Sequence, residues 1–409
     1  MRKTRVAAAA AVLAVVVVGG ARAAGSFVEP TVLLHTFSGT TPGANFGWAV
    51  SELADVDGDG AAEVIIGEPF TATGTTYVYS GGSGELVYRL DGAPGDLQGF
   101  AMADAGDTDG DGTSDILTGA PGRDAGHAYL YSGSTGELLH QFAGVHAGDF
   151  FGWAVGPAGD VDRDGFADVV VGAPFADQGG RDSGRAYVYS GRTYELLRKL
   201  DAGRAGDSFG TAVDGGRDLT GDGIPDLLVG ARDTPGPGGP GAVYAFSGKN
   251  GRPLWRADAP ATGGQFGSFF VSSLPDLTGD GVPDVYVGDY ADSGGAGRPV
   301  VLSGSDGSEV FAWPGTPGAG AGPGRGAGDV DGDGVEDLAV GHFTFGADGA
   351  GKLELRSGSD GSLLRTITST TPGENFGFDA VGIGDVNDDG RPDLLVSAAT
   401  GETVYVIAG

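Results

Sequence analysis

A nine-residue acidic pattern occurs seven times in the chain, and its residue types are those that bind a hard cation. The first copy runs from Asp55 to Glu63 and reads D-V-D-G-D-G-A-A-E. Position 6 is glycine in every copy, position 9 is always acidic, and position 3 is Asp in four copies, Thr in two and Asn in one. Alternating oxygen-bearing side chains, a glycine for a tight turn and a closing carboxylate are what Ca²⁺ requires. The pattern therefore predicts seven calcium loops, up to one ion each, in which position 7 contributes only its backbone carbonyl.

The candidate ligands lie at positions 1, 3, 5, 7 and 9 of each loop. They are Asp55, Asp57, Asp59, Ala61, Glu63, Asp107, Asp109, Asp111, Thr113, Asp115, Asp160, Asp162, Asp164, Phe166, Asp168, Asp218, Thr220, Asp222, Ile224, Asp226, Asp276, Thr278, Asp280, Val282, Asp284, Asp329, Asp331, Asp333, Val335, Asp337, Asp385, Asn387, Asp389, Arg391 and Asp393. Ordinary acidic surface turns are the alternative, because Asp and Gly also dominate turns. Seven copies in the same phase argue against it.

A calcium loop between two helices is a competing motif, and the flanking residues exclude it. An EF-hand requires a bidentate Glu at position 12 and a helix on each side. Position 12 here is Ile66 in the first copy and Thr118 in the second, each inside a strand-like apolar segment. The loops are therefore expected to connect strands.

The loops belong to a longer repeat, since their first aspartates are 52, 53, 58, 58, 53 and 56 residues apart. Each unit contains an apolar segment that opens on Phe-Gly, the acidic loop, a strand-like segment and a hairpin. In the third unit the first and third parts are Phe151–Val155 and Val169–Gly172. Short β-branched and aromatic runs bounded by Gly, Ser and Pro indicate strands. Four strands in each of seven units predict an all-β, seven-bladed β-propeller of antiparallel sheets; an open solenoid is the alternative architecture.

The two ends of the chain favour the closed ring. The seventh unit stops at its third strand, Thr403–Ile407, two residues before the end of the sequence. A segment that resembles a fourth strand, Thr31–Phe37, stands alone at the other end. Pairing the two would complete the last blade and cover two sheet edges. The sequence therefore predicts a propeller closed by its N-terminal strand.

The combination of Phe-Gly, the acidic loop and Gly-Ala-Pro resembles the FG-GAP repeat of integrin alpha-subunit propellers and related bacterial proteins. Gly-Ala-Pro is complete at Gly119–Pro121 and Gly172–Pro174. Two units depart from the pattern, because Gln98 replaces the second Phe and Gly318–Gly328 replaces the opening of the sixth unit. The resemblance covers residues 31–409 and implies a seven-bladed ring, calcium in some blades and an adhesion role. A shared fold does not by itself entail integrin function.

Residues 1–24 have the features of a signal peptide. Arg2, Lys3 and Arg5 precede the apolar stretch Ala7–Val18, and Ala21–Ala23 forms an A-x-A cleavage site. We expect residues 25–409 to form one propeller domain that is secreted, extracellular or periplasmic, monomeric and without a transmembrane anchor. The chain has no cysteine, so disulfides cannot stabilise it. Its net charge of −31 excludes binding to a nucleic-acid backbone.

Two main function classes follow. The favoured one is a calcium-binding module that engages a protein or glycan, and the rival is an enzyme or enzyme subunit on the same scaffold; a matrix protein without a ligand is a third possibility. Gly206–Gly210 matches the G-x-S-x-G pattern around Ser208, but this stretch is the opening of the fourth unit, so no catalytic residue is predicted. Weaker ligand-binding candidates are the inserts Asp177–Gly184 and Asp233–Gly241, with the tryptophans Trp48, Trp153 and Trp255.

Overall fold

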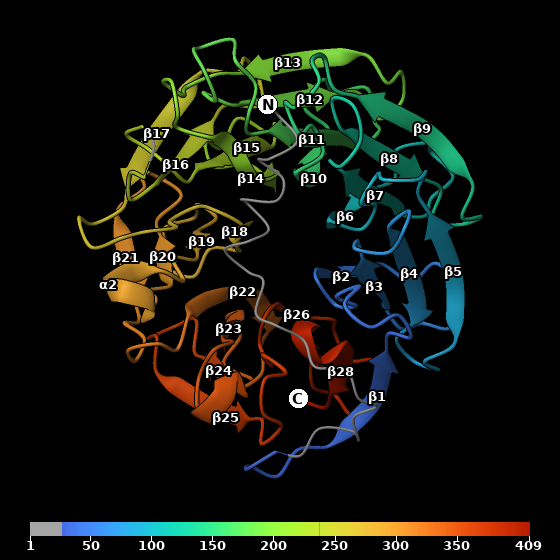
Figure 1. Ribbon diagram of the computed structural model, residues 1–409, viewed down its shortest axis with the longest axis vertical. Helices are drawn as coiled ribbons and strands as arrows, with labels where there is room; N and C mark the ends of the chain where they lie inside the picture. Colours follow the sequence, from blue (N-terminus) through green and yellow to red (C-terminus); the bar gives the residue numbers. More distant parts are fainter. Residues whose placement is uncertain (1–26, 237) are drawn as a thin grey trace.

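Seven four-stranded antiparallel sheets surround a central axis and confirm the predicted seven-bladed β-propeller (Figure 1). The computed structural model describes residues 27–236 and 238–409. The predicted signal peptide lies outside the described residues. The blades, from the innermost strand outward, are β2 (Val50–Leu53), β3 (Glu63–Glu68), β4 (Thr75–Ser80) and β5 (Leu86–Asp91); β6 (Ala101–Gly106), β7 (Asp115–Ala120), β8 (His127–Tyr131) and β9 (Leu138–Ala143); β10 (Ala154–Gly159), β11 (Asp168–Ala173), β12 (Arg185–Tyr189) and β13 (Leu196–Leu200); β14 (Phe209–Arg217), β15 (Asp226–Ala231), β16 (Ala242–Phe246) and β17 (Pro253–Asp258); β18 (Val271–Ser273), β19 (Val285–Val287), β20 (Val300–Leu302) and β21 (Glu309–Ala312); β22 (Ala321–Gly328), β23 (Asp337–His342), β24 (Lys352–Arg356) and β25 (Leu363–Thr368); and β26 (Ala380–Gly382), β27 (Leu394–Ala398), β28 (Thr403–Ile407) and β1 (Leu33–Ser38).

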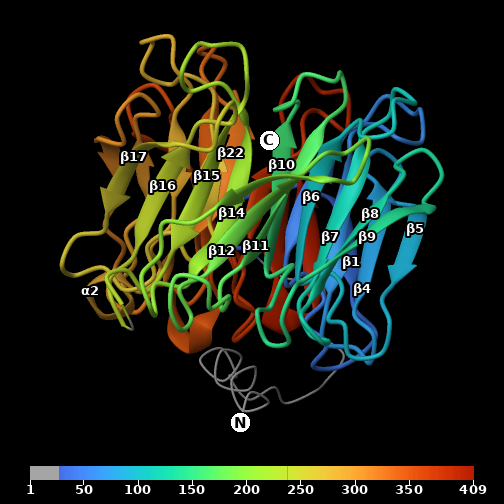
Figure 2. The same cartoon turned by 90° about the horizontal axis from the view of Figure 1, so that it is seen from above.

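The second strand of each blade is its most buried element, which explains its sequence. In β11 every residue from Asp168 to Ala173 is buried, because the strand lies between two sheet neighbours and two adjacent blades. A strand covered on both faces reads as a continuous apolar run. The outermost strands are instead mostly exposed or half-buried, and in β5 only Leu90 is buried. Each innermost strand lies between a Phe-Gly turn and an acidic loop in the sequence, so the two flank opposite ends of the strand, and Figure 2 shows the strands crossing the ring from one face to the other.

Two glycines of the repeat meet where one blade packs on the next. A Cβ atom added to Gly172, at the end of the second strand, would lie 2.1 Å from the backbone oxygen of Gly210. Gly210 belongs to the Phe-Gly turn of the following blade and has a φ of +90°, a conformation that glycine adopts without strain. The glycines of the Phe-Gly and Gly-Ala-Pro motifs therefore permit close packing between neighbouring blades.

The two atypical units still form regular blades. In other blades the Phe of the Phe-Gly turn, such as Phe151, forms an isolated parallel bridge. In the two atypical blades Gln98 and Ala321 form the corresponding bridge. Gln98 is fully buried, and its amide donates to Leu90 O at 3.3 Å and to the Tyr131 hydroxyl at 3.1 Å. A hydrogen-bonded amide thus replaces an aromatic ring in the second blade, and a small alanine fills the position in the sixth.

The ring closes as the sequence predicts. β1 pairs antiparallel with β28, and Phe37 lies opposite Val404 while Ser38 lies opposite Thr403. The junction also has a polar anchor, because the Glu402 carboxylate accepts hydrogen bonds from the backbone N–H groups of Gly43, Asn45 and Phe46. The open solenoid is therefore wrong, and the N-terminal strand completes the seventh blade.

Helical structure in the described residues is confined to three single turns, α2 (Asp292–Gly295), η1 (Ala347–Gly349) and η2 (Ala399–Gly401). Within the same residues, no helix has the length and hydropathy needed to span a bilayer.

Candidate metal centres and the axial cavity

All seven acidic loops fold in the same way, because the first aspartate organises the backbone around itself. In the first loop, Asp55 accepts hydrogen bonds from the N–H groups of Gly58, at 2.7 Å, and Gly60, at 2.9 Å. Both glycines have positive φ, +83° and +92°. The position of Gly58 is left-handed even where it is not glycine, as at Arg163 and Asp388. Position 1 therefore shapes the loop in addition to offering an oxygen to a cation.

In six of the seven loops the position 9 carboxylate accepts a hydrogen bond from the glycine that follows the third strand of its own blade. Asp168 is fully buried, and its two oxygens accept hydrogen bonds from Val161 N–H at 2.9 Å and Gly191 N–H at 3.1 Å. Gly191 follows the third strand, in a Ser-Gly pair that recurs in most units. A Cβ atom there would lie 1.9 Å from Ala167 O. The recurrence of Ser-Gly was the sequence signal for this contact, although its role was not predicted.

The hairpin also reaches the position 5 aspartate in several blades. Ser80 Oγ donates to Asp59 Oδ2 at 2.9 Å, and Ser134 makes the equivalent hydrogen bond to Asp111. In the fourth blade Lys249 Nζ lies 3.2 Å from Asp222 Oδ2. The loop and the hairpin turn thus form one polar unit on the same face of each blade.

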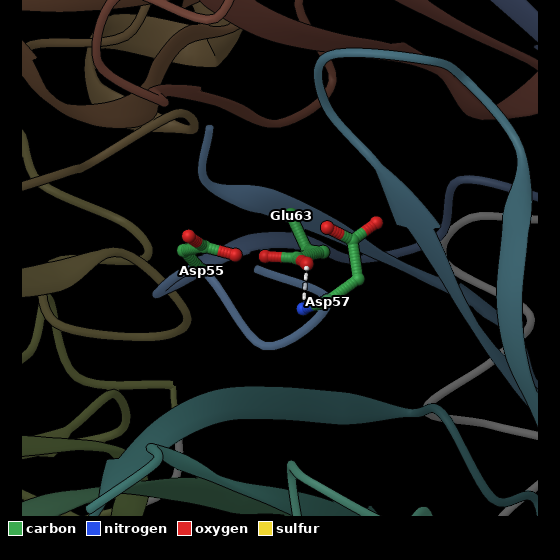
Figure 3. A group of neighbouring side chains, drawn as sticks. All are labelled: Asp55, Asp57 and Glu63. Atoms are coloured by element: carbon green, nitrogen blue, oxygen red, sulfur yellow. Dashed lines mark hydrogen bonds between the residues drawn. The ribbon is translucent and has the colours of Figure 1, made fainter. Parts of the chain in front are cut away.

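Four of the seven loops bring three carboxylates together, with one oxygen of each within 4.8 Å of the others. Figure 3 shows the first of them, in which Glu63 lies between Asp55 and Asp57. The four groups are Asp55, Asp57 and Glu63; Asp107, Asp109 and Asp115; Asp160, Asp162 and Asp168; and Asp329, Asp331 and Asp333. A set of carboxylates completed by the backbone carbonyl of position 7 fits the all-oxygen coordination of Ca²⁺.

The three loops with Thr or Asn at position 3 form no such group within the described part of the chain. Thr220 and Thr278 instead donate from their hydroxyls to the position 1 carboxylates Asp218 and Asp276. Asn387 Nδ2 donates to Asp393 Oδ1 at 3.1 Å. Position 3 therefore divides the predicted sites into four acidic loops and three with a neutral third position.

Burial perturbs the position 9 carboxylates. Burial, with a smaller contribution from the neighbouring aspartates, raises the pKa of Glu63 and of Asp168 to about 7 against the opposing effect of the backbone N–H donors. An unfolded chain releases these protons near pH 4. Between about pH 4 and pH 7 the metal-free folded state therefore binds more protons than the unfolded state, and these two groups lower its stability as the pH rises.

This difference in bound protons predicts that the stabilities of metal-free and calcium-loaded protein change with pH in opposite directions. Without metal, the loops should make the folded state more stable at pH 5 than at pH 7.5. With saturating calcium, protons compete with the ion, so the loops should make the folded state more stable at pH 7.5. Urea unfolding at both pH values gives the change in the free energy of unfolding with pH, first for metal-free and then for calcium-loaded protein. The difference between these two slopes cancels the contribution of titratable groups outside the loops. Equal slopes would contradict the assignment of position 9 as a ligand.

A cavity of 480 Å³ lies on the ring axis, and the innermost strand of every blade, or the residues leading into it, lines its wall. We call it the axial cavity. Aromatic rings follow one another around it: the ring centroids of Trp48 and Phe378 are 5.4 Å apart, those of Trp48 and Phe100 5.4 Å, and those of Phe100 and Trp153 4.8 Å. The equivalent repeat positions of Trp48 and Trp153 thus place both in the cavity wall. Trp255 lies elsewhere and donates to Gly304 O.

The cavity is lined by five charged side chains. They are Glu52, Asp104, Asp214, Asp379 and Arg325. Arg325, from the atypical opening of the sixth unit, lies 2.8 Å from Asp379 Oδ2 and also donates to Val50 O. Sequence reasoning missed this group, because five different blades contribute one member each and no linear motif joins them.

The remaining sequence candidates do not converge on a second centre. Ser208 Oγ donates to Asp233 Oδ2 at 2.8 Å, in the Phe-Gly turn of the fourth blade, whereas a serine nucleophile would donate to an imidazole. The insert Asp233–Gly241 supplies this aspartate, and the insert Asp177–Gly184 folds back on itself, since Asp182 N–H donates to Asp177. None of the carboxylate groups suited to a metal, among the residues described, includes a histidine.

Comparison with known proteins agrees with the repeat. The FG-GAP repeat model matches residues 103–132 and 151–189, and the FG-GAP-like repeat model matches residues 218–287 and 329–396. Chicken integrin alpha-6 is 34% identical over 175 residues, which cover 40% of this chain and 16% of the integrin. Chicken integrin alpha-V is 32% identical over 215 residues, 45% of this chain and 20% of the integrin. The chain thus matches no more than about a fifth of either relative.

Structural comparison supports the fold alone. The crystal structure of BBS1N in complex with ARL6DN, soaked with mercury, contains a chain that matches with a TM-score of 0.59 at 12% sequence identity; the match covers 92% of this chain and 96% of that one. The family models match segments in blades two to seven, and the integrin relatives share the repeat at 32–34% identity. The chain is therefore an FG-GAP repeat protein, and its ring is an integrin-alpha-like β-propeller.

Proposed function

We propose that the chain is an extracellular, calcium-stabilised ligand-binding module of the adhesion type. The observation that carries this proposal is the set of four acidic loops, each preformed by backbone N–H groups around three convergent carboxylates. Its relatives are integrin alpha subunits, which supports an adhesion role at the cell surface. Export through the signal peptide at residues 1–24 is part of the proposal and would expose the loops to extracellular calcium.

In each loop the side chains at positions 1, 3, 5 and 9 and the backbone carbonyl at position 7 would hold the ion. Bound calcium supplies positive charge that offsets the mutual repulsion of the carboxylates. Affinity rises with the number of charged ligands. The loops that begin at Asp55, Asp107, Asp160 and Asp329 are therefore proposed as the tighter sites, and those that begin at Asp218, Asp276 and Asp385 as the weaker ones.

Removal of one ligand should remove one site. Asp160→Ala takes away a carboxylate and the acceptor for the N–H groups of Asp164 and Gly165, so the third loop should lose both its charge and its shape. Isothermal titration with calcium should count one tight site fewer than in the native protein. Asp306→Ala, in an exposed hairpin turn outside the loops, is the matched control and should leave the count unchanged. An unchanged count in Asp160→Ala would refute the ligand assignment.

The proposed ligand is a protein or a glycan that binds to loops on one face of the ring. Capture from a native cell envelope, with calcium and with EGTA, tests this directly. A specific ligand should be retained with calcium and released by the chelator. Protease or periodate treatment of the envelope before capture then distinguishes the two ligand classes.

An enzyme built on the propeller is the rival hypothesis, and the axial carboxylates are the groups it would use. Three of them already accept hydrogen bonds from the backbone of a neighbouring blade. Asp104 accepts from Ala54 N–H, Asp214 from Ser273 N–H and Asp379 from Val50 N–H. These contacts hold adjacent innermost strands together, which favours a structural or binding role for the carboxylates over proton transfer.

A further inference from the structure

The axial cavity carries an excess of negative charge that the protein itself does not neutralise. Four carboxylates line it, Glu52 from the first blade, Asp104 from the second, Asp214 from the fourth and Asp379 from the seventh, against the single guanidinium of Arg325. Full ionisation would leave a balance of −3 inside the ring. Uncompensated buried charge is costly, so such a group either binds a proton or gains a cation.

Internal contacts satisfy these carboxylates unequally. Asp379 is paired with Arg325 and accepts from two backbone N–H groups. Asp104 accepts from Gly106 N–H at 2.7 Å and Ala54 N–H at 3.2 Å, and Asp214 accepts from Ser273 N–H. In contrast, Glu52 Oε2 is buried and accepts no hydrogen bond. Glu52 is therefore the carboxylate in the cavity wall that most needs a partner.

The cavity does not have the geometry of a metal site. Groups of three carboxylates whose oxygens lie within 4.8 Å of one another occur, among the described residues, in the acidic loops and not in the cavity. Its carboxylates come from separate blades, and much of the rest of its wall is apolar or aromatic, including Met102, Val155 and Phe269. Carboxylates on separate blades in a largely apolar wall suit a cation whose charges are joined by hydrocarbon.

We propose that the axial cavity binds a linear aliphatic polyamine, with ammonium groups at Glu52, Asp104 and Asp214 and methylene segments along the aromatic wall. Its volume of 480 Å³ lies within the range of small-molecule sites. Ammonium groups are also attracted to the faces of Trp and Phe rings, such as Trp48 and Phe100. Burial raises the pKa of Glu52, Asp104 and Asp214, although the charge of Arg325 opposes this at Glu52 and Asp214. None of these three carboxylates is among the proposed calcium ligands.

Isothermal titration with spermidine, at saturating calcium so that the loops are occupied, tests the proposal. One spermidine per chain should bind, at least tenfold more tightly than butylamine, because three charges are matched instead of one. Glu52→Gln keeps the shape but removes the unpartnered charge, and it should weaken binding at least tenfold. Glu85→Gln, on the exposed hairpin of the same blade, is the matched control and should bind like the native protein.

A second variant guards against loss of folding. Glu52→Lys brings a tethered ammonium into the cavity, so it should melt no lower than the native protein in calcium and should not bind spermidine. Equal affinity in Glu52→Gln and the native protein, several equivalent sites per chain, equal affinity for butylamine, or no binding at millimolar spermidine would each overturn the proposal. The calcium proposal is judged separately, since Glu52→Gln should leave the calcium titration unchanged.

Discussion

Chelation of calcium is expected to lower the melting temperature by more than about ten degrees, because one occupied site adds about 2.7 kcal/mol at a calcium concentration one hundred times its Kd. Extracellular calcium modules bind with Kd values of about 10⁻⁴–10⁻³ M. Four acidic loops at about 10 mM calcium should together contribute roughly 6–11 kcal/mol. A change of 1 kcal/mol corresponds to roughly 2 °C in a large domain.

The effect should be large because the metal-free loops oppose folding. Each acidic loop holds three carboxylates whose oxygens lie within 4.8 Å of one another, and the chain has no disulfide to resist their repulsion. Propeller blades contact mainly their neighbours, so loops weakened in the first three blades, which are adjacent, should loosen one continuous part of the ring.

Circular dichroism melting curves in calcium, in EGTA and in EGTA followed by excess calcium measure this effect and its reversal. Magnesium is the matched cation control. It demands near-octahedral geometry at shorter distances and retains its waters, so it should restore only a small part of the lost stability. A melting temperature that is the same in excess EGTA and in calcium would refute the metal assignment of the loops.

The repeat made the fold predictable from the sequence. Thr31–Phe37 resembled a fourth strand without a blade of its own, which predicted that it pairs with the last blade and closes the ring. β1 does pair with β28. The spacing of loop residues also located the convergent carboxylates, because ligands at alternating positions of one short loop are close in sequence and in space. Contacts within one short loop can therefore be predicted from the sequence alone.

Other parts of the site could not be read from the sequence. The left-handed backbone at Arg163 and Asp388 is imposed by the loop, since few residues other than glycine adopt it and Asp does so more readily than Arg. The axial cavity depends on contacts between blades that are about fifty residues apart or more, and Arg325 lies in one of the two units that lack the Phe-Gly opening. A departure from the repeat thus marked the only cation among the described residues of the wall, but its pairing with Asp379 follows only from the packing of the sixth blade on the seventh.

Deletion of the N-terminal strand should convert the monomer into dimers or aggregates. A variant that begins at Ser38 loses most of β1 and leaves β28 as an outer edge, with unpaired backbone groups between Thr403 and Ile407. An exposed edge of this kind is a template for pairing with another chain. Size-exclusion chromatography with light scattering should find the variant that begins at Gly25 monomeric and the one that begins at Ser38 associated.

The contribution of β1 must be separated from that of the residues before it. Phe27 packs edge-on against Phe376 and Tyr405, and Glu29 accepts hydrogen bonds from Thr368. A variant that begins at Thr31 removes these contacts and keeps the strand, so it is the matched control. It should melt at a lower temperature than the variant that begins at Gly25 but stay monomeric. Association of this control would assign the effect to Phe27 and Glu29 instead of the strand.

A disulfide between β1 and β28 tests their pairing directly. Ser38 and Thr403 are register partners across β1 and β28, and the native chain has no cysteine that could compete. Ser38→Cys with Thr403→Cys should form an intramolecular disulfide if the Cβ atoms lie at bridging distance, about 3.5–4.5 Å. The bond should raise the melting temperature under oxidising conditions only, and each single variant should form at most intermolecular dimers. A double variant that stays reduced, together with a monomeric Ser38 truncation, would show that the ring closes without this strand.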